Sequence, residues 1–195
     1  MSGLPERIVL ATRNPHKVEE IRRICADWPV EWVTDLEIPA VEETGATYLE
    51  NALLKAREVA AASSVAALAD DSGIEVDALG GAPGPRSARY AGESASDEEN
   101  LRALIRAMAG VPGGGRTARY RAVAVLAWPD GPAIHAEATC EGQLETRPRG
   151  EGGFGYDPIF VPMGADRTMA ELSPEEKDRI SHRGGALRAL REALG

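Results

Sequence analysis

Two adjacent carboxylates, Asp70 and Asp71, are the side chains best suited to acid–base or metal chemistry. The apolar residues 65–68 before them are typical of a buried strand, and residues 74–79 after them alternate like a half-buried strand. Charge at the end of a buried strand is costly unless it is paired, bound to a metal or used in catalysis. Because Asp, Ser and Gly are also ordinary turn formers, residues 69–73 taken alone fit a solvated turn equally well.

A helix start near the N-terminus gathers a second set of polar groups. A predicted strand over residues 7–11 leads to Asn14, a good N-cap, and to Pro15, which suits the first helical position. Free backbone N–H groups would then point to one place, where they could bind phosphate. The side chains that converge there are Thr12, Arg13 and Lys17. No Walker-type loop occurs in the chain, and a capped helix after a strand is also common without a ligand.

A polar pair lies on the helix that the capping-box residues Thr47 and Glu50 predict. Asn51 and Lys55 lie four residues apart and therefore point the same way. An exposed lysine is normally only solvated, but acidic residues precede this helix and follow it. The carboxylates that could form one set are Glu42, Glu43, Asp70 and Asp71.

A glycine-rich loop over residues 150–158 contains Phe154 and Tyr156, two of the chain's six Phe and Tyr residues. Exposed aromatic rings there could stack on a flat ligand, or they could close the end of the sheet. A donor-rich cluster near helix starts follows this loop, and it comprises Lys177, His182 and Arg183.

The remaining pattern alternates strands and helices. Predicted strands cover residues 7–11, 30–34, 65–68, 74–79, 117–128, 133–146 and 159–161, with a loop over 35–46. The two long strands form a hairpin, which we expect to be a lobe or an edge of the sheet. Predicted helices follow the caps Asn14, Thr47, Ser96 and Ser173, a short helix covers 168–172, and the last helix follows Ser181. The helix from Ser96 to residue 109 is interpreted as structural.

Length and composition exclude several classes of protein. With 195 residues, 43% of them hydrophobic, the chain can bury a core as one domain or as two lobes that share a sheet. The longest apolar runs are too short for a membrane span, and residues 1–7 lack the apolar stretch of a signal peptide. We therefore expect a cytoplasmic protein without a membrane partner. Cys25 and Cys140 have no metal-type spacing and are interpreted as packing residues.

The net charge of −9 argues against a nucleic-acid partner, because such binding needs a positive field over many phosphates. One small polyphosphate that arrives with a divalent cation remains possible. It needs only a local cluster of cations and helix N-termini, and surplus carboxylates can hold the metal.

Seven segments of the sequence, in their order and spacing, resemble the inosine triphosphate pyrophosphatase family over nearly the whole chain. Within that family, the sequence is most similar to the bacterial dITP/XTP pyrophosphatases. The matching segments are residues 12–17, 42–45, 50–56, 69–73, 80–92, 152–158 and 181–184. One departure is Arg13, where the family often has Gly. Arginine there adds a cation beside the expected phosphates.

The resemblance implies an α/β fold, with two lobes sharing a long central mixed sheet flanked by helices in a single domain over residues 1–195, and an active site in the cleft between the lobes. It also implies hydrolysis of dITP, ITP or XTP to the monophosphate and pyrophosphate, with Mg²⁺ as cofactor and a homodimer as the usual assembly.

Site residues follow from the same resemblance, position by position. Asp71 matches the general base, and either Glu42 or Glu43 matches the metal-binding acid, a choice that the sequence leaves open. Asp70 would tune the base or help to hold the metal. The positions that the resemblance places in contact with substrate are Thr12, Arg13, Asn14, Pro15, His16, Lys17, Ser72, Phe154, Gly155, Tyr156, Asp157, Lys177, His182 and Arg183. Asn51 and Lys55 are expected to contact substrate because of their shared helix face near the carboxylates.

The expected reaction is attack of water at the α–β phosphate link after Asp71 takes its proton, while Lys17, Lys55 and the helix start at Asn14 stabilise the pyrophosphate charge. Donors such as Arg183, His182 or loop N–H groups would donate to the 6-oxo group of the purine, and they would be left unpaired by the amino group of adenine.

Three alternatives remain open from the sequence. The chain could be a related pyrophosphatase acting on other modified nucleotides, including pyrimidines, a nucleotide-binding sensor that has lost turnover, or a structural protein whose loops cap a sheet. A sensor would gain nothing from so many carboxylates near an anion, and a structural role leaves the ordered segments unexplained.

Overall fold

The computed structural model describes residues 3–34 and 36–195. Met1, Ser2 and Asp35, the first residue of the loop expected over 35–46, lie outside the described residues. The strands are β1 (Arg7–Leu10), β2 (Glu31–Val33), β3 (Ala66–Val76), β4 (Thr117–Ala127), β5 (Ala133–Leu144) and β6 (Phe160–Pro162). The helices are α1 (Pro15–Ile24), α2 (Tyr48–Ser63), α3 (Asp97–Ala107), α4 (Pro174–Ile180) and α5 (His182–Leu194).

The six strands form a mixed sheet in the order β2-β1-β3-β4-β5-β6. β1 runs parallel to β2 and β3, whereas β5 and β6 are antiparallel. The α/β class and the mixed sheet are thereby confirmed. The expected hairpin, a lobe or an edge of the sheet, is present as β4 and β5, and β5 is not the last strand of the sheet because β6 pairs with its residues Gly142, Gln143 and Leu144. Gly142 permits this pairing, since a Cβ there would lie 2.4 Å from the Val161 carbonyl oxygen.

The chain divides into two compact units. Unit 1 comprises the described parts of Met1–Asp71 together with Ala122–Ala138 and His182–Gly195. Unit 2 comprises Ser72–Arg121 and Thr139–Ser181.

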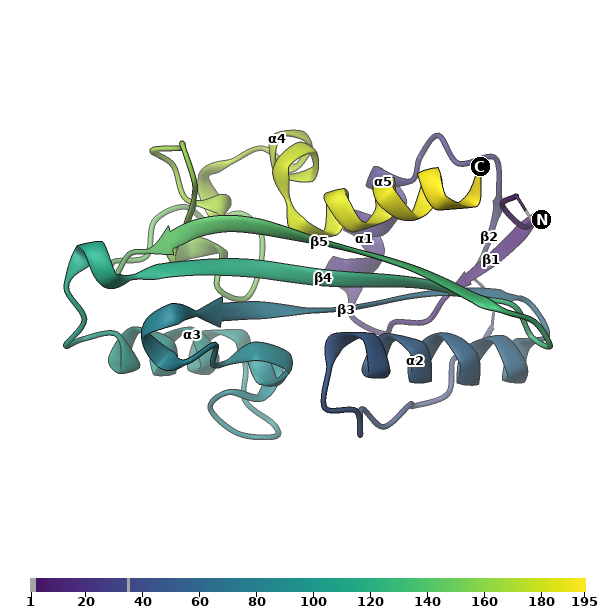
Figure 1. Cartoon of the computed structure of the whole chain (residues 1–195), viewed down its shortest axis with the longest axis horizontal. Helices are drawn as coiled ribbons and strands as arrows, with labels where there is room; N and C mark the ends of the chain where they lie inside the picture. The colour runs from purple at the N-terminus through teal and green to yellow at the C-terminus, as the bar shows by residue number, and fades with distance from the viewer. Residues whose placement is uncertain (1–2, 35) are drawn as a thin grey trace. The chain divides into compact units, whose positions relative to one another are not determined.

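Unit 1 is built in layers around the N-terminal part of β3. Figure 1 shows α2 on one face of this part of the sheet and α1 and α5 on the other. Leu68 packs with Ile21 and Leu187 on the α1 and α5 side, whereas Ala67 and Ala69 pack against α2. This is the alternation of a strand buried on both faces, and it determines where the next side chains of β3 point.

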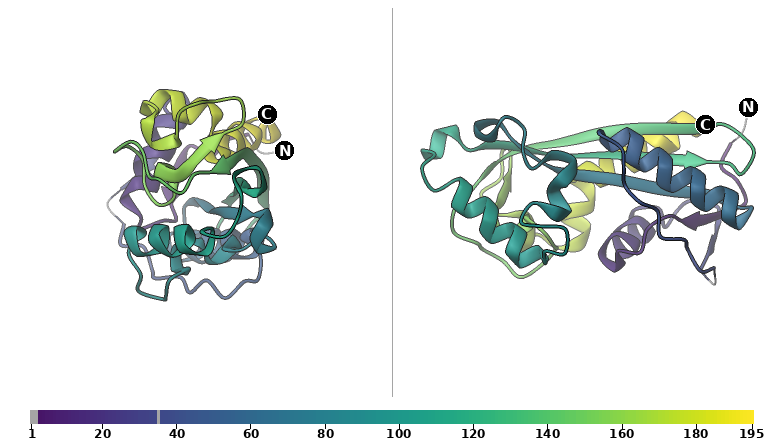
Figure 2. Two further views of the ribbon diagram at one scale, coloured as in Figure 1. Left: turned by 90° about the vertical axis from the view of Figure 1, so that its left-hand side faces the viewer. Right: turned by 90° about the horizontal axis from the view of Figure 1, so that it is seen from below.

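Unit 2 has its own apolar core, to which Ile74, Leu104 and Phe160 contribute. Helix α3 is joined to the neighbouring segment Gly84–Arg89, a short 3-10 helix (Figure 2). The side chain of Asn100 makes this link, because it accepts a hydrogen bond from the Ala91 N–H and donates one to the Ala88 carbonyl.

The turn expected at residues 69–73 is wrong, because β3 runs without interruption from Ala66 to Val76. The strand can continue because it lies between β1 and β4, and its acidic side chains have buried cationic partners instead of solvent. The second strand expected over 74–79 ends early, since Asp77–Leu79 forms a 3-10 helix.

The predicted helix starts are confirmed by their caps. Asn14, Thr47, Ser96 and Ser173 each accept backbone hydrogen bonds in the first turn of their helices. Helix α3 ends at Ala107, two residues before the expected end. Within residues 3–34 and 36–195, no helix combines the length and the apolar character that crossing a membrane requires.

Candidate functional site

Asp70 and Asp71 are neighbours on β3, so their side chains point to opposite faces of the sheet. Asp70 lies on the face covered by α1 and α5, and Asp71 lies on the face covered by α2. β1 ends at Leu10, which is paired with Leu68, so both acids come just past the carboxyl end of a parallel strand. In open α/β sheets, ligands bind just beyond the carboxyl ends of the strands.

Lys55 is the centre of the group on the α2 face. Its Nζ atom donates to Asp71 Oδ1, Glu43 Oε1 and the Asp70 carbonyl, each at 2.8 Å. Asn51 Nδ2 lies 3.5 Å from Asp71 Oδ2, and Asn51 Oδ1 accepts from the Gly45 N–H at 2.8 Å. The helical spacing of Asn51 and Lys55 therefore brings both to Asp71, although both are buried and not solvated.

Asp70 is the centre of the group on the opposite face. Lys17 Nζ lies 3.1 Å from its Oδ1 atom. Arg183 Nε donates to the Oδ2 atom of Asp70 at 3.1 Å, and a terminal nitrogen of Arg183 lies 3.0 Å from the same oxygen. Arg183 also pairs with the buried Glu20 of α1. These four side chains come from α1, β3 and α5, and all lie in unit 1.

The two neighbouring acids have opposite pKa shifts. Burial by itself would raise the pKa of Asp70, but the charges of Arg183 and Lys17 outweigh burial and hold that pKa well below its usual range. Burial dominates at Asp71 and raises its pKa above the ordinary value, against the opposing charge of Lys55. Asp71 is therefore the stronger base of the two.

The two lysines also differ in pKa. Burial is the main influence on Lys17 and lowers its pKa below the ordinary value. Burial would lower the pKa of Lys55 as well, but the charges of Asp71, Asp70 and Glu43 outweigh it and raise that pKa. Lys55 is therefore a fixed cation beside Asp71.

The start of α1 differs in one respect from the expected phosphate site. The Asn14 side chain accepts from the backbone N–H groups of His16, at 3.0 Å, and Lys17, at 3.4 Å. These two groups are not free, because a good N-cap residue satisfies them itself. Thr12 Oγ1 accepts from the Asn14 N–H at 3.2 Å, while Arg13, Pro15 and His16 have exposed side chains.

Asp157 is the centre of a third group, which lies in unit 2. Its Oδ2 atom accepts from Lys177 Nζ at 2.6 Å and from the Phe154 N–H at 2.9 Å, and its Oδ1 atom accepts from the Tyr120 hydroxyl at 3.1 Å. Lys177 Nζ also lies 4.9 Å from the centre of the Phe154 ring, within range of a cation–π interaction. The glycine-rich loop is thus tied to α4.

Of the two aromatic rings expected to be exposed, only that of Phe154 is partly accessible. Tyr156 is buried, and its hydroxyl donates to the Ser87 carbonyl at 2.7 Å, so its ring belongs to the core. Phe154 is half-buried and Gly155 adopts a left-handed backbone with a φ of 62°. Ser72 is half-buried on β3.

The expected cluster of Lys177, His182 and Arg183 is divided among separate partners. Lys177 pairs with Asp157 in unit 2, and Arg183 pairs with Asp70 and Glu20 in unit 1. His182 is buried at the first position of α5.

Comparison with known proteins identifies the family. The sequence model of the Ham1 family matches residues 8–193. The chain belongs to the Ham1 family. A dITP/XTP pyrophosphatase of Thermus thermophilus is 52% identical to this Ham1-family chain over 189 residues, which cover 96% of this chain and 91% of that protein. The dITP/XTP pyrophosphatase of Escherichia coli (strain K12) is 47% identical over 193 residues, covering 97% and 98%.

A solved structure shares the fold. The HAM1 protein from Coxiella burnetii matches this Ham1-family structure with a TM-score of 0.87 and 40% identity, over 97% of this chain and 98% of that chain. The family resemblance inferred from the sequence is confirmed.

The carboxylates of this Ham1-family chain do not form the single set that was expected. Asp70 faces away from Glu43 and Asp71 because successive side chains of a strand alternate, and Glu42 is exposed. Among the described residues, no three His, Cys, Asp or Glu side chains are grouped closely enough to hold a metal ion. Mg²⁺ needs fewer protein ligands than that, since it is commonly held by one or two carboxylates together with water and substrate phosphates. The oxygen donors Glu43 and Asp71 fit that requirement.

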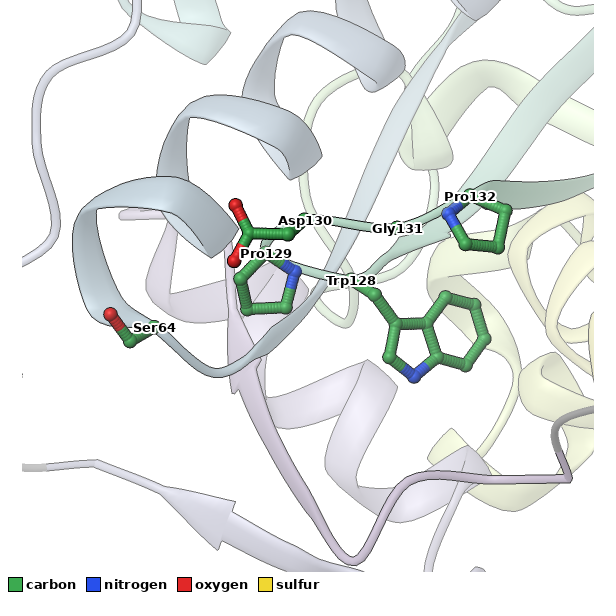
Figure 3. Close-up of a pocket in the computed structure, with 6 residues that line it drawn as sticks. All are labelled: Ser64, Trp128, Pro129, Asp130, Gly131 and Pro132. Atoms are coloured by element: carbon green, nitrogen blue, oxygen red, sulfur yellow. The ribbon is translucent and has the colours of Figure 1, made fainter.

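A cavity of about 440 Å³ lies elsewhere in unit 1. It is lined by the end of α2 at Ser64 and by residues 128–132 of the β4–β5 turn (Figure 3). None of the expected site residues lines it. Trp128 and the turn prolines give it apolar walls, which do not suit a polyphosphate.

Three residues of the site groups were missed from the sequence. Glu20 could have been noticed, because it is a charged residue beside Ile21 on the apolar side of α1. Tyr120 lies on the long strand β4, where an aromatic residue is common and gives no sign of a polar contact. Asp97, whose carboxylate accepts from the Gly155 N–H at 3.1 Å, lies in the first turn of a helix that the sequence predicts to be structural.

Proposed function

We propose that this Ham1-family protein hydrolyses noncanonical purine nucleoside triphosphates, namely dITP, ITP and XTP, to the nucleoside monophosphate and pyrophosphate. Relatives named dITP/XTP pyrophosphatase, 47–52% identical over nearly the full chain, support this substrate class. The observation that carries the chemistry is the buried Asp71 carboxylate, whose pKa is raised and whose two oxygens are held by Lys55 and Asn51.

Asp71 is proposed as the general base that removes a proton from the attacking water. A base must be ionised at the working pH, yet it is stronger when its pKa lies above that of an ordinary carboxylate. Burial supplies the raised pKa, and Lys55 keeps the charged form accessible. Lys55 and Asn51 also fix the direction of the carboxylate, which reduces the cost of orienting water for attack.

Glu43 and Asp71 are proposed to hold Mg²⁺. The sequence left Glu42 and Glu43 as equal candidates, and Glu43 is preferred because its carboxylate reaches the Lys55 and Asp71 group whereas Glu42 is exposed. When bound, Mg²⁺ lowers the pKa of a coordinated water and offsets phosphate charge. Lys17 and Lys55 are proposed to stabilise the remaining charge of the pyrophosphate.

The Asp157 group is proposed to contact the purine. Phe154 offers a half-buried ring for stacking, and Lys177 is already held at that ring by Asp157. His182 and Arg183 remain proposed donors to the 6-oxo group. The guanidinium of Arg183 is oriented by Asp70 and Glu20, so it is rigid enough to discriminate between bases.

A homodimer in the cytoplasm remains the proposed setting, on the strength of the family resemblance. Light scattering would then give a mass of about twice the 20.7 kDa of one chain. A mass of one chain at micromolar concentration would contradict the dimer.

The direct test is release of pyrophosphate from dITP, ITP, XTP, GTP and ATP, with Mg²⁺ and with a chelator. We expect metal-dependent release from the first three, and a fall of about 100-fold or more in kcat for Asp71→Asn, because a general base contributes about that much. Asp130→Asn, an exposed acid of the β4–β5 turn, is the matched control and should retain full activity. Binding of ITP without any release would favour the sensor alternative, and preference for a modified pyrimidine would favour the related pyrophosphatase.

A further inference from the structure

The glycine-rich loop that carries Phe154 is held from two directions within unit 2. Asp157 holds it from inside, through the Phe154 N–H, Lys177 and Tyr120. Asp97 holds it from α3, because its Oδ2 atom accepts from the Gly155 N–H at 3.1 Å. Gly155 has a φ of 62°, so this turn of the loop has a backbone conformation that other residues rarely adopt.

The position of Asp97 is not explained by the needs of its own helix. The start of α3 already has a complete capping box, since Ser96 Oγ accepts from the Glu99 N–H at 3.3 Å and Glu99 Oε2 accepts from the Ser96 N–H at 2.8 Å. The Asp97 carboxylate is left to bind a backbone group 58 positions further along the chain. Hydrogen bonds that a carboxylate accepts are among the stronger ones, so this contact can fix a loop.

We propose that Asp97 is a positioning residue for nucleotide binding, which acts through Gly155 on the orientation of the neighbouring Phe154 ring. This inference rests on the proposed function of the loop as the site that contacts the purine. Asp157 and Lys177 fix the Phe154 side of the loop, and Asp97 fixes the next peptide group. The ring is thereby held in place before substrate arrives, and the cost of ordering it on binding is reduced.

Three variants separate positioning from helix stability. Asp97→Ala removes the acceptor. Asp97→Asn removes the charge but keeps a side-chain oxygen that can accept from Gly155. Glu98→Ala is the matched control, since it removes an acid of the same first helical turn and an exposed ion pair with Arg102 without touching the loop.

For Asp97→Ala we expect KM for ITP to rise about three- to tenfold, with kcat within about twofold of wild type, because one charge-assisted hydrogen bond is lost from binding and none from chemistry. Asp97→Asn should restore KM to within about twofold, and Glu98→Ala should leave it unchanged. Amide hydrogen exchange at residues 154 and 155 should become faster in Asp97→Ala alone.

Two kinds of result would overturn the inference while the wild-type enzyme still hydrolyses ITP. One is an unchanged KM and unchanged amide exchange in Asp97→Ala. The other is an equal rise of KM in Asp97→Ala and Glu98→Ala, which would reduce the effect to the stability of α3. Absence of turnover by wild type would instead contradict the proposed function, and the exchange measurement would still test whether Asp97 orders the loop.

Discussion

Asp70 and Asp71 are adjacent in the chain but are used by different parts of unit 1. The pleat of β3 sends Asp70 to Lys17 and Arg183, and it sends Asp71 to Lys55. One carboxylate is stabilised as a permanent anion and the other is left with a raised pKa. Neighbouring acids whose environments separate their pKa values in this way commonly have separate tasks. We therefore propose a structural role for Asp70 and proton transfer for Asp71.

We expect the charge of Lys55 to set the acid limb of the pH–rate profile. Lys55→Met removes a cation that favours ionised Asp71, so the pKa of Asp71 should rise further and the acid limb of kcat/KM should move to higher pH. At neutral pH, kcat/KM should also fall by about 100-fold, as expected when a preorganised charge is lost from a site. Profiles measured between pH 4 and about 9 would show both effects.

Arg57→Met is the control for this change, because it replaces an exposed cation of the same helix. It should leave the acid limb in place. A limb that stays in place or moves to lower pH in Lys55→Met would mean that Asp71 is not the group whose ionisation limits the reaction.

At the scale of the elements, local chemistry made the helix starts predictable and left the course of β3 unpredictable. Asn14, Thr47, Ser96 and Ser173 each satisfy backbone N–H groups within three residues, so their effect is visible in a short stretch of sequence. The acids of β3 obtain their partners from α1, α2 and α5. Since those contacts are distant in sequence, the pattern Asp-Asp-Ser-Gly looked like a turn.

The same distinction applies to the candidate site. Asn51 and Lys55 were found because helical spacing places them together, and Asp71 because a buried acid is costly. Glu20 and Asp97 were missed because their roles depend on Arg183 and Gly155, more than 50 positions away. Contacts of that kind follow only from the packed structure.

The glycine-rich loop depends on the close approach of Gly153 to Asp157, and a substitution at Gly153 tests this dependence. Gly153 has a φ of 70°, and a Cβ there would lie 2.1 Å from Asp157 Oδ2, the atom that binds Lys177 and the Phe154 N–H. Gly153→Ala should therefore displace the Asp157 carboxylate and raise KM for ITP by about tenfold, as two charge-assisted hydrogen bonds weaken.

Gly164→Ala is the matched control, since Gly164 has a φ of 81° but nothing within 4 Å of the place that a Cβ would occupy. Both variants should lose about 1 kcal/mol or more of unfolding free energy, because alanine tolerates a left-handed backbone poorly. Urea unfolding and Michaelis–Menten kinetics would separate the two effects. An equal KM in both variants would show that the position of Asp157 is unimportant for binding.

At the scale of the whole molecule, the negative net charge of the chain opposes binding of a polyphosphate. The chain carries a net charge of −9. The cations beside Asp70 and Asp71 in unit 1 do not make this region positive, because Lys17, Lys55 and Arg183 are paired with carboxylates. Those carboxylates are Glu20, Glu43, Asp70 and Asp71. We therefore expect a triphosphate to need a divalent cation for binding as well as for chemistry.

Binding should accordingly stabilise the protein only when metal is present. With Mg²⁺ and an α,β-imido analogue of ITP at about 100 times its Kd, ligand binding contributes about 2.7 kcal/mol, which raises Tm by about 5–10 °C in a chain of this size. With a chelator, the analogue should raise Tm by less than about 2 °C.

Glu43→Gln should lose most of the metal-dependent rise in Tm because it removes a proposed metal ligand. Glu42→Gln, one position away and exposed, should retain that rise. Equal losses in both variants would mean that a general acidic field attracts the metal, and equal stabilisation with and without Mg²⁺ would mean that the paired lysines bind the triphosphate by themselves.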